Sequence, residues 1–350
     1  MTELELILTQ NDYVRDILNG PLAIRNSIDT WVHEEQLAII TERIHSFNYK
    51  KIILTGMGSS FHALYPLYLR LIQHCIPVYH IETSELIYYS TELLTDDCLT
   101  IIVSQSGESI EIKKLLCENH NRGLIVGITN TEQSTLSAKT DCLFLTHAGI
   151  EKSVSCKTYM TALAAITLLG DILLEENTSN TIKDLGIAAT AIQNYLANIE
   201  NHVSKLIDLF FEIKYLIVTG RGMSLASAHV SGLIIKEASH FFAEGMSSAA
   251  FRHGPFEIVL SDLFLMVFSG DQAVCELNKK LVNDVQSCGG KAVIVKQGKE
   301  CNPFVIPVVP DSILPIVEML PAQMLSIALS IIHEHEPGKF DLISKVTLNE

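Results

Sequence analysis

Short apolar runs alternate along most of the chain with stretches whose apolar residues recur at helical spacing. This alternation is typical of α/β proteins, in which helices pack against both faces of a parallel sheet. Helices of ordinary length are expected between the runs, for example over residues 60–74 and 110–119. The runs predict strands at residues 51–55, 77–81, 99–104, 124–129 and 142–145, and then at 215–219, 263–268 and 291–295.

One unit occurs twice in this pattern. Residues 51–64 read KIILTGMGSSFHAL and residues 214–228 read KYLIVTGRGMSLASA, so that Gly56 aligns with Gly220, 164 positions later. Each copy is a strand, a Gly-rich turn and a helix start that carries hydroxyl side chains. Such an arrangement binds phosphate through backbone N–H groups and the helix dipole.

The two copies differ after their second central strand. Residues 104–109 read SQSGES, whereas the corresponding residues 267–271 read VFSGD and have lost most of the hydroxyls. We therefore expect an intact phosphate site in the first copy and a degenerate one in the second.

The chain has 350 residues, of which 48% are hydrophobic, and this is enough for two domains that each bury a core. Forty acidic against 25 basic residues give a formal net charge of -15. A field of this sign repels phosphate backbones and acidic membrane surfaces, so neither nucleic acid nor a membrane is expected as a partner. Any anion that the protein binds must be held by local groups.

The eight cysteines form no CxxC pair and mostly lie in apolar runs, where a reduced thiol packs as a small hydrophobic side chain. The first residues, MTELELILTQND, contain acidic residues and no basic region before an apolar core, so no secretory signal is expected. No membrane span is expected, because no run of 18 apolar residues free of charge was found. These features favour a reducing, cytoplasmic location.

Turn residues and apolar periodicity divide the chain into four regions. The polar stretch 175–186, EENTSNTIKDLG, is interpreted as a turn-rich junction, and a helix is predicted over residues 187–211. The expected regions are an N-terminal helical segment 1–34, a first domain 35–180, a second domain 187–335 and a C-terminal arm 336–350. The arm is expected to lie over other parts of the protein, because its apolar side chains would otherwise be exposed: Leu342, Ile343, Val346 and Leu348.

The first candidate for phosphate binding is GMGSS at residues 56–60. Glycines at the end of a strand let a ligand approach the backbone, and the hydroxyls of Ser59 and Ser60 lie at a helix start, where unpaired N–H groups point outward. The segment contains neither GxGxxG nor GK[ST], so it does not indicate a dinucleotide site or a Walker loop. A tight turn without a ligand is the alternative for this segment alone.

The second candidate is SQSGES, which directly follows the apolar run LTIIV. The carboxyl end of a central strand is the usual ligand edge of an open α/β sheet. Ser104, Gln105, Ser106 and Ser109 offer neutral donors there, which allow an acidic protein to hold a phosphate ester. The alternative is a serine-rich loop that caps the next helix at Ser106 or Ser109.

Glu237 is the candidate general base. It ends an apolar helical face, and Glu244 follows seven residues later, which on a helix is two turns on and on the same side. Partial burial would raise the pKa of such a carboxylate towards neutrality, where it accepts and returns a proton most effectively. The alternative is a surface residue that pairs with Lys236 or His240.

His253 stands between Arg252 and a Gly-Pro pair, a rigid turn that would present the imidazole. A purely structural histidine is the alternative at this position. The triplet His333-Glu334-His335 is interpreted as a solvated helix end. No metal site and no cofactor are predicted.

Taken together, these motifs resemble proteins with two sugar-isomerase (SIS) domains. The resemblance rests on TGMGSS, SQSGES, the stretch EKSVSCKTYMTAL at residues 151–163, IIKEAS followed by FRHGP, and the terminal LISKVT. Similar proteins are the isomerase half of glucosamine-6-phosphate synthase, stand-alone amino-sugar-phosphate deaminases and fructosamine-phosphate deglycases. The resemblance covers the chain from about residue 19 to its end and implies two SIS-type domains, each a five-stranded parallel sheet between two layers of helices.

The resemblance also implies which residues bind the substrate. The 6-phosphate would be held by the residues that match the family's phosphate loop: Ser60, Ser104, Gln105, Ser106 and Ser109. The sugar would be lined by Ser59, Val154 and Ser155.

The resemblance implies the catalytic residues as well. Glu237 would move a proton between C1 and C2, and His253 would come from the neighbouring subunit of a homodimer and help to open the sugar ring. Lys345 would close the site and form an imine with the open-chain ketose. No metal is needed, because one carboxylate within reach of two adjacent carbons can serve both.

Departures from the synthase limit these expectations. The chain begins MTELEL, with no room for a glutaminase domain, so glutamine-dependent synthesis is not expected. Ile234 stands where the synthase has a lysine, an acid is lost at Ala250, and the tail reads Ser344-Lys345 in place of Lys-Ser. We expect an isomerase that releases ammonia or an amine from a six-carbon sugar phosphate. A non-catalytic sugar-phosphate sensor and a plain hexose-phosphate isomerase are the alternatives.

Overall fold

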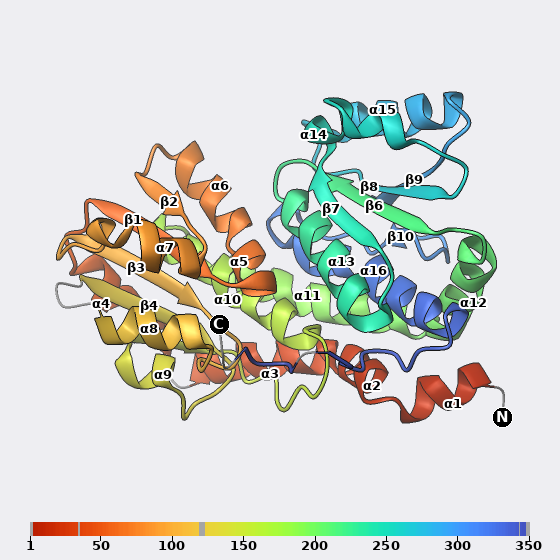
Figure 1. Ribbon diagram of the computed structural model, residues 1–350. Helices are drawn as coiled ribbons and strands as arrows, with labels where there is room; N and C mark the ends of the chain where they lie inside the picture. The colour runs from red at the N-terminus through yellow and green to blue at the C-terminus, as the bar shows by residue number, and fades with distance from the viewer. Residues whose placement is uncertain (1–2, 34–35, 119–122, 343, 348–350) are drawn as a thin grey trace. The chain divides into compact units, whose positions relative to one another are not determined.

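The computed structural model describes residues 3–33, 36–118, 123–342 and 344–347 (Figure 1). The chain divides into two compact units, and each contains one five-stranded sheet. The first unit comprises Leu22–Glu151, Lys157–Gly186 and residues 344–347 of the C-terminal segment. The second unit comprises residues 3–21, Lys152–Cys156 and Ile187–Leu342.

The sheet of the first unit is parallel throughout and has the strand order β2-β1-β3-β4-β5. Strands β3 and β4 are buried along their whole length, as expected for central strands with helices on both faces. The chain leaves β1 towards β2 on one side and returns to β3 on the other, so the strand order reverses between β1 and β3. The strands are β1 (Lys51–Gly56), β2 (Val78–His80), β3 (Cys98–Val103), β4 (Leu124–Thr129) and β5 (Cys142–Leu145).

Helices of the first unit cover both faces of this sheet. Helices α7, α8 and α9 bury one apolar face against β1, β3 and β4, and α10 packs against α4, α5 and α6. Two further helices, α3 (Gly20–His33) and α11 (Thr178–Leu196), each contain one of the points where the chain passes from one unit to the other. The helices are α4 (Gln36–His45), α5 (Gly58–Ala63), α6 (Tyr65–Gln73), α7 (Thr83–Tyr89), α8 (Ile110–Glu118), α9 (Thr135–Lys139) and α10 (Lys157–Leu173), with one 3-10 turn, η1 (Thr91–Leu93).

The sheet of the second unit has the order β10-β9-β8-β6-β7, again with parallel pairs only. Read from β7, this order repeats the connectivity of the first sheet, as the duplicated sequence predicts. The strands are β6 (Tyr215–Gly220), β7 (Ala243–Ser247), β8 (Leu263–Phe268), β9 (Lys291–Gln297) and β10 (Val305–Ile306). The helices are α1 (Glu3–Gln10), α2 (Asp12–Leu18), α12 (Ile199–Phe210), α13 (Ser224–Ser239), α14 (Ser248–Arg252), α15 (Cys275–Ser287) and α16 (Leu314–Ile332), with 3-10 turns η2 (Pro255–Ile258) and η3 (Asp311–Ile313).

The predicted fold class is therefore confirmed, and all eight predicted strands are present within a few residues of their predicted bounds. Two strands were missed. Strand β7 reads AEGMS and has no β-branched residue, while β10 has only two residues, so neither carries the usual strand signal. The predicted turn-rich junction is wrong in its local structure, because α11 begins at Thr178. The Asn177 side chain accepts the N–H of Ser179 at 3.0 Å and thus starts that helix within the polar stretch.

Residues 311–332 form a helical stretch that is long and apolar enough to cross a membrane by length and composition, the one such stretch in the described part of the chain. In its most apolar window 89% of the residues are buried inside the protein. The stretch ends in α16, which packs against α12 and α13. It is the core helix of the second unit.

Hydrogen bonds to its backbone hold the start of the C-terminal arm. The Gly338 N–H donates to the carbonyl of Ala238 at 2.9 Å, and the side-chain Nδ2 of Asn11 donates to the carbonyl of Pro337 at 3.1 Å. The expectation that the arm covers Leu342 is wrong, since this side chain is 96% exposed. Val346 is half-buried, and Ile343 and Leu348 lie outside the described residues.

Candidate active site

The carboxyl ends of β1 and β3 lie side by side in the first unit. Their register pairs Gly56 with Val103, so the segments GMGSS and SQSGES leave the sheet at the same level. A Cβ atom on Gly56 would lie 2.9 Å from the carbonyl oxygen of Val103, which only glycine avoids. Because the strand order reverses here, this edge is where open α/β sheets bind their ligands.

Ser59 and Ser60 lie in the first turn of α5, where both are half-buried. The turn begins at Gly58, whose φ of 52° lies in the left-handed region that favours glycine. Within the described residues, neither serine hydroxyl has a hydrogen-bond partner from the chain. Both hydroxyls therefore are available to a ligand at this edge of the sheet.

The SQSGES segment is a tight loop that uses two of its own hydroxyls. The Ser104 Oγ accepts the N–H of Gly107 at 3.1 Å, and the Ser106 Oγ accepts the N–H of Glu108 at 3.2 Å. Gly107 has a φ of 64°, and a Cβ there would lie 2.4 Å from the Ser134 Oγ. Ser104 and Ser106 thus cap turns within the loop, and neither caps α8.

The other two predicted residues of this loop differ from these serines. Gln105 anchors the loop through its backbone carbonyl, which accepts the N–H of Asn130 at 3.0 Å and the hydroxyl of Thr129 at 3.2 Å. Ser109 is half-buried directly before α8, and among the described residues its hydroxyl has no partner in the chain. The carbonyl of Thr347 accepts the N–H of Ile110, the first residue of α8, at 3.2 Å.

Glu108 is a carboxylate within the loop that the sequence analysis did not consider. Its oxygens contact Lys113 at 2.7 Å and accept the backbone N–H of Thr135. The hydrogen bond from Lys113 lowers the pKa of Glu108 to about 2, so it is ionised at neutral pH. The cation of Lys113 offsets this negative charge, which would otherwise oppose a bound phosphate.

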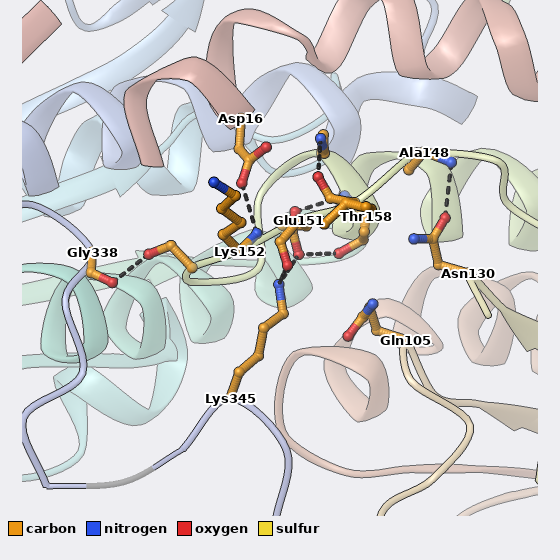
Figure 2. A network of polar contacts seen from close by, with 12 residues as sticks. Asp16, Gln105, Asn130, Ala148, Glu151, Lys152, Thr158, Gly338 and Lys345 are labelled. Carbon is orange, nitrogen blue, oxygen red and sulfur yellow. Dashed lines mark hydrogen bonds and ion pairs between the residues drawn. The ribbon is translucent and has the colours of Figure 1, made fainter. Parts of the chain in front are cut away.

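Lys345 is bound to a buried carboxylate in the first unit (Figure 2). Its Nζ donates to the side chain of Glu151 at 2.9 Å and to the Glu151 carbonyl at 2.7 Å. The Glu151 carboxylate also accepts the backbone N–H and the hydroxyl of Thr158, at 3.0 and 2.6 Å. The side chain of Glu151 is fully buried and that of Lys345 is 21% exposed, so this pair fastens the C-terminal segment to the start of α10.

Glu151 itself is positioned by the segment that follows β5. The Asn130 Oδ1 accepts the N–H of Ala148 at 2.8 Å, a contact that Figure 2 shows, and its Nδ2 donates to the carbonyl of Gly149 at 2.8 Å. Glu151 begins the motif EKSVSCKTYMTAL, but no role for it was expected from the sequence. A carboxylate that stands six residues after an expected strand, and six residues before the largely apolar helix α10, was the available signal.

The remaining predicted residues belong to the second unit. Val154 is 1% exposed, so its side chain is not available to line a sugar and only its backbone can serve, while Ser155 is half-buried. Their segment is held by Asp16, whose carboxylate accepts the N–H of Lys152 at 3.0 Å (Figure 2).

Glu237 lies near the end of α13 and is half-buried. The expected position of Glu244 on the same helix is wrong, because α13 ends at Ser239 and Glu244 lies on β7. Lys236 Nζ lies 3.2 Å from the carboxylate of Glu244. One of the two residues that were considered as surface partners of Glu237, Lys236, therefore pairs with Glu244. His253 follows α14 and is exposed, and Gly254 after it has a φ of 128° that a non-glycine residue rarely adopts.

The second copy of the phosphate turn contains an internal carboxylate. Ser224, which the repeat aligns with Ser60, donates its hydroxyl to Glu318 Oε1 at 2.6 Å, and Ser227 donates to Oε2 at 2.6 Å. Glu318 is 1% exposed on α16. The helix start of the second copy thus keeps a hydroxyl, as the repeat predicts, but the hydrogen bond of Ser224 goes to a side chain of the same unit. A lone charge in the apolar sequence LPIVEML was the signal that could have revealed Glu318.

Burial raises the pKa of Glu318 from 4.5 to about 7, against the opposing hydrogen bonds of the two serines, and Asp271 and Asp311 raise it further. The folded protein holds this proton more tightly than the unfolded chain does. The contribution of Glu318 to the free energy of unfolding is therefore fully present below about pH 4.5 and is lost as the pH rises to about 7. The decline amounts to about 3 kcal/mol for a shift of this size.

Glu318→Gln should remove this dependence, because the amide keeps the shape and the serine hydroxyls can both donate and accept. Urea unfolding at pH 5 and pH 8 measures the effect as the difference between wild type and variant. The two proteins should be about equally stable at pH 5, and the variant should be more stable by about 3 kcal/mol at pH 8. A variant less stable than wild type at pH 8 would contradict the assignment.

Comparison with known proteins supports the resemblance drawn from the motifs. The family model of the SIS domain matches residues 47–170. Glutamine–fructose-6-phosphate aminotransferase (isomerizing) from Pyrococcus horikoshii is 27% identical over 343 residues, which are 93% of this chain and 56% of that protein. The chain thus spans little more than half the length of this curated relative.

Solved structures show the same fold. The C-terminal domain of glucosamine-fructose-6-phosphate aminotransferase from Francisella tularensis matches with a TM-score of 0.82 at 22% identity and covers 94% of this chain and 98% of its own. Glucosamine-6-phosphate deaminase from Thermotoga maritima matches with a TM-score of 0.78 at 18% identity, and the match covers 97% of this chain and 100% of the deaminase chain. The resemblance to SIS-domain proteins is therefore confirmed in sequence over residues 47–170 and in the fold of the chain.

Proposed function

We propose that this protein is a phosphosugar enzyme that isomerises an amino-sugar or glycated-amine 6-phosphate and releases ammonia or the amine. The observation that carries the proposal is the pair of hydroxyl-bearing loops at the strand-order reversal of the first sheet. In a protein with a net charge of -15, uncharged donors and helix starts at this edge supply a local site for a phosphate ester. The SIS domain match over residues 47–170 covers both loops.

Two relatives favour a nitrogen-bearing substrate. The aminotransferase and the deaminase are named for reactions that join an amino group to a hexose 6-phosphate or remove it. By analogy we assign the phosphate to Ser60, Ser104, Gln105, Ser106 and Ser109, and the sugar to Ser59, Ser155 and the backbone of Val154. Since the chain covers only 56% of the aminotransferase, glutamine use lies outside the proposal.

The proposed chemistry begins with ring opening, assisted by His253 from the neighbouring subunit of a homodimer. Glu237 then takes a proton from C2 and returns it to C1, while a proton passes from the amine nitrogen to O1, so that the aldehyde becomes a C1 hydroxyl and the C2 amine becomes an imine. Water adds to this imine, and ammonia leaves as the C2 ketone forms. For glucosamine 6-phosphate the sum is one water consumed, with one fructose 6-phosphate and one ammonia produced.

Lys345 is proposed to hold the C-terminal segment over the bound sugar. Its hydrogen bonds to Glu151 keep the ammonium in a polar, largely buried pair. An imine between Lys345 and a ketose would require this amine to leave Glu151 and lose its proton. We therefore propose that the main role of Lys345 is to position the C-terminal segment and to supply positive charge, and that imine formation is secondary.

Incubation with glucosamine 6-phosphate tests the proposed function directly. Equal amounts of ammonia and fructose 6-phosphate are expected, measured by coupled enzymatic assays over time, and Glu237→Gln protein purified in the same way provides the blank. Glycated-amine and unsubstituted hexose 6-phosphates complete the panel. Ketose formation without amine release from any member would indicate a plain isomerase, and binding without product would indicate a sensor; both outcomes would overturn the proposal.

A further inference from the structure

Two imidazoles and a carboxylate converge on the surface of the second unit. They are His240, His335 and Asp341, and their ligand atoms all lie within 4.8 Å of one another. The three residues come from separate parts of the unit: the end of α13, the turn after α16, and the C-terminal arm. None of them belongs to the proposed reaction.

The backbone around His240 is held in place on both sides. His240 caps α13 in the left-handed conformation, with φ at 52°, and its N–H donates to the carbonyl of Lys236 at 3.1 Å. The arm is bound to the same helix end through Gly338, whose N–H donates to Ala238 at 2.9 Å. His335 is fixed by its own N–H, which donates to the carbonyl of Ser330 at 2.8 Å.

A second contact sets the tautomer of His240. Its Nε2 lies 3.1 Å from the carbonyl oxygen of Lys339, which can only accept, so Nε2 carries the hydrogen and Nδ1 presents a lone pair. A carbonyl on the far ring nitrogen is the usual arrangement for a histidine that binds a metal through the other nitrogen. Here that other nitrogen, Nδ1, faces the carboxylate of Asp341.

The spacing suits two ligands of one ion better than a hydrogen bond. His240 Nδ1 lies 3.8 Å from Asp341 Oδ2, whereas donor and acceptor atoms in a hydrogen bond lie at about 2.7–3.2 Å. Ligands at about 2.0–2.1 Å from a tetrahedral zinc ion are separated by about 3.3 Å, which small side-chain rotations reach. The rings of His240 and His335 have centroids 4.9 Å apart.

Competing interactions of these groups are weak. Lys339 Nζ lies 3.8 Å from Asp341 Oδ1, at the outer limit of an ion pair, and both side chains are about half exposed. Exposed pairs of this kind contribute little to stability. A divalent ion therefore displaces no strong contact when it binds Asp341.

We propose that His240, His335 and Asp341 form a binding site for a divalent transition-metal ion of the zinc, cobalt or nickel type. Two imidazole nitrogens and one carboxylate oxygen favour such ions over magnesium or calcium, which prefer oxygen ligands. Water completes the coordination at this exposed position. The bound ion fastens the arm at Asp341 to α13 and α16, four residues before Lys345 in the sequence.

Titration of the full chain with cobalt(II) tests the site, because its visible absorption bands report the ligands. One ion per chain is expected, without the near-ultraviolet charge-transfer band that thiolate ligands add, and zinc should compete for the same site.

Three variants complete the test. His335→Ala and Asp341→Asn should each weaken binding at least tenfold, since loss of an outer contact alone often costs about 10–100-fold in affinity. His333→Ala is the matched control, because His333 is an exposed residue of the same segment outside the cluster. Unchanged melting temperatures without metal would show that the variants fold. Thiolate bands, the absence of one saturable site, or undiminished binding by His335→Ala would each overturn the proposal.

Discussion

Replacement of Glu237 by Gln is expected to lower kcat on the proposed amino-sugar phosphate by about 10²–10⁴-fold, the usual contribution of a positioned general acid–base group. Glutamine preserves the size and polarity of the half-buried side chain on α13, but it cannot take a proton from C2 and return it to C1. Affinity for the phosphosugar should be unchanged, because the phosphate is assigned to residues of the first sheet. Steady-state assays measure kcat, and incorporation of solvent deuterium at C1 measures the proton transfer.

Glu244→Gln is the matched control for this variant. Glu244 is an exposed carboxylate on the strand that follows α13 and pairs with Lys236, the residue next to Glu237 in the sequence. Its neutralisation tests whether loss of any negative charge in this region lowers turnover. Normal turnover by the Glu237 variant, or an equal loss in both variants, would contradict the assignment of Glu237 as the base.

Removal of two hydroxyls from the phosphate loops is expected to weaken phosphosugar binding by about 10²–10⁴-fold. The double variant Ser60→Ala with Ser109→Ala removes two hydrogen bonds to a charged group, each worth about 1.5–3 kcal/mol, and about 1.4 kcal/mol corresponds to a factor of ten. These serines are chosen because, among the described residues, their hydroxyls have no partner in the chain. Ser104 and Ser106 stabilise the loop itself, so their loss would confuse binding with folding.

Kd from calorimetry and KM from kinetics measure the effect of the double variant. Ser46→Ala serves as the control, because Ser46 is an exposed serine whose hydroxyl donates to the Arg43 carbonyl near the end of α4. An unchanged Kd in a folded double variant would show that the phosphate does not bind at this edge of the first sheet.

The strands and the phosphate loops could be predicted from the sequence because their signals are local. A central parallel strand is buried on both faces and reads as a continuous apolar run, as CLTIIV and LFLMVF do. The Gly-rich turns follow such runs directly, so the strand pattern also located the candidate phosphate site. Strand β7 was not predicted, because its pairing with β6, and not its composition, makes it a strand.

Three carboxylates with evident structural roles were not predicted, because their partners are distant in sequence or depend on loop geometry. Lys345 contacts Glu151 across 194 positions, and Ser224 contacts Glu318 across 94 positions. Glu108 pairs with a lysine only five residues away, but the turn at Gly107 decides where its side chain lies. No periodicity encodes such contacts, whereas a lone acid in an apolar stretch at least indicates that a partner exists.

The repeat therefore combines two different states of one turn. Ser60 in the first copy has a hydroxyl that is available to a ligand, whereas the hydroxyl of Ser224 in the second copy is bound to Glu318. The aligned positions at the end of β8 and just after it carry Phe268, Gly270 and Ala273 where the first copy has Ser104, Ser106 and Ser109. One phosphosugar is therefore expected to bind to each chain, at the first sheet.

Calorimetric titration of the Glu237→Gln variant with glucosamine 6-phosphate tests this claim most directly, because the inactive protein binds without turnover. One binding site per chain is predicted, and the additional changes Ser60→Ala and Ser109→Ala should weaken it by at least about 10². Two equivalent sites per chain, or one site that is indifferent to the serine changes, would contradict the account.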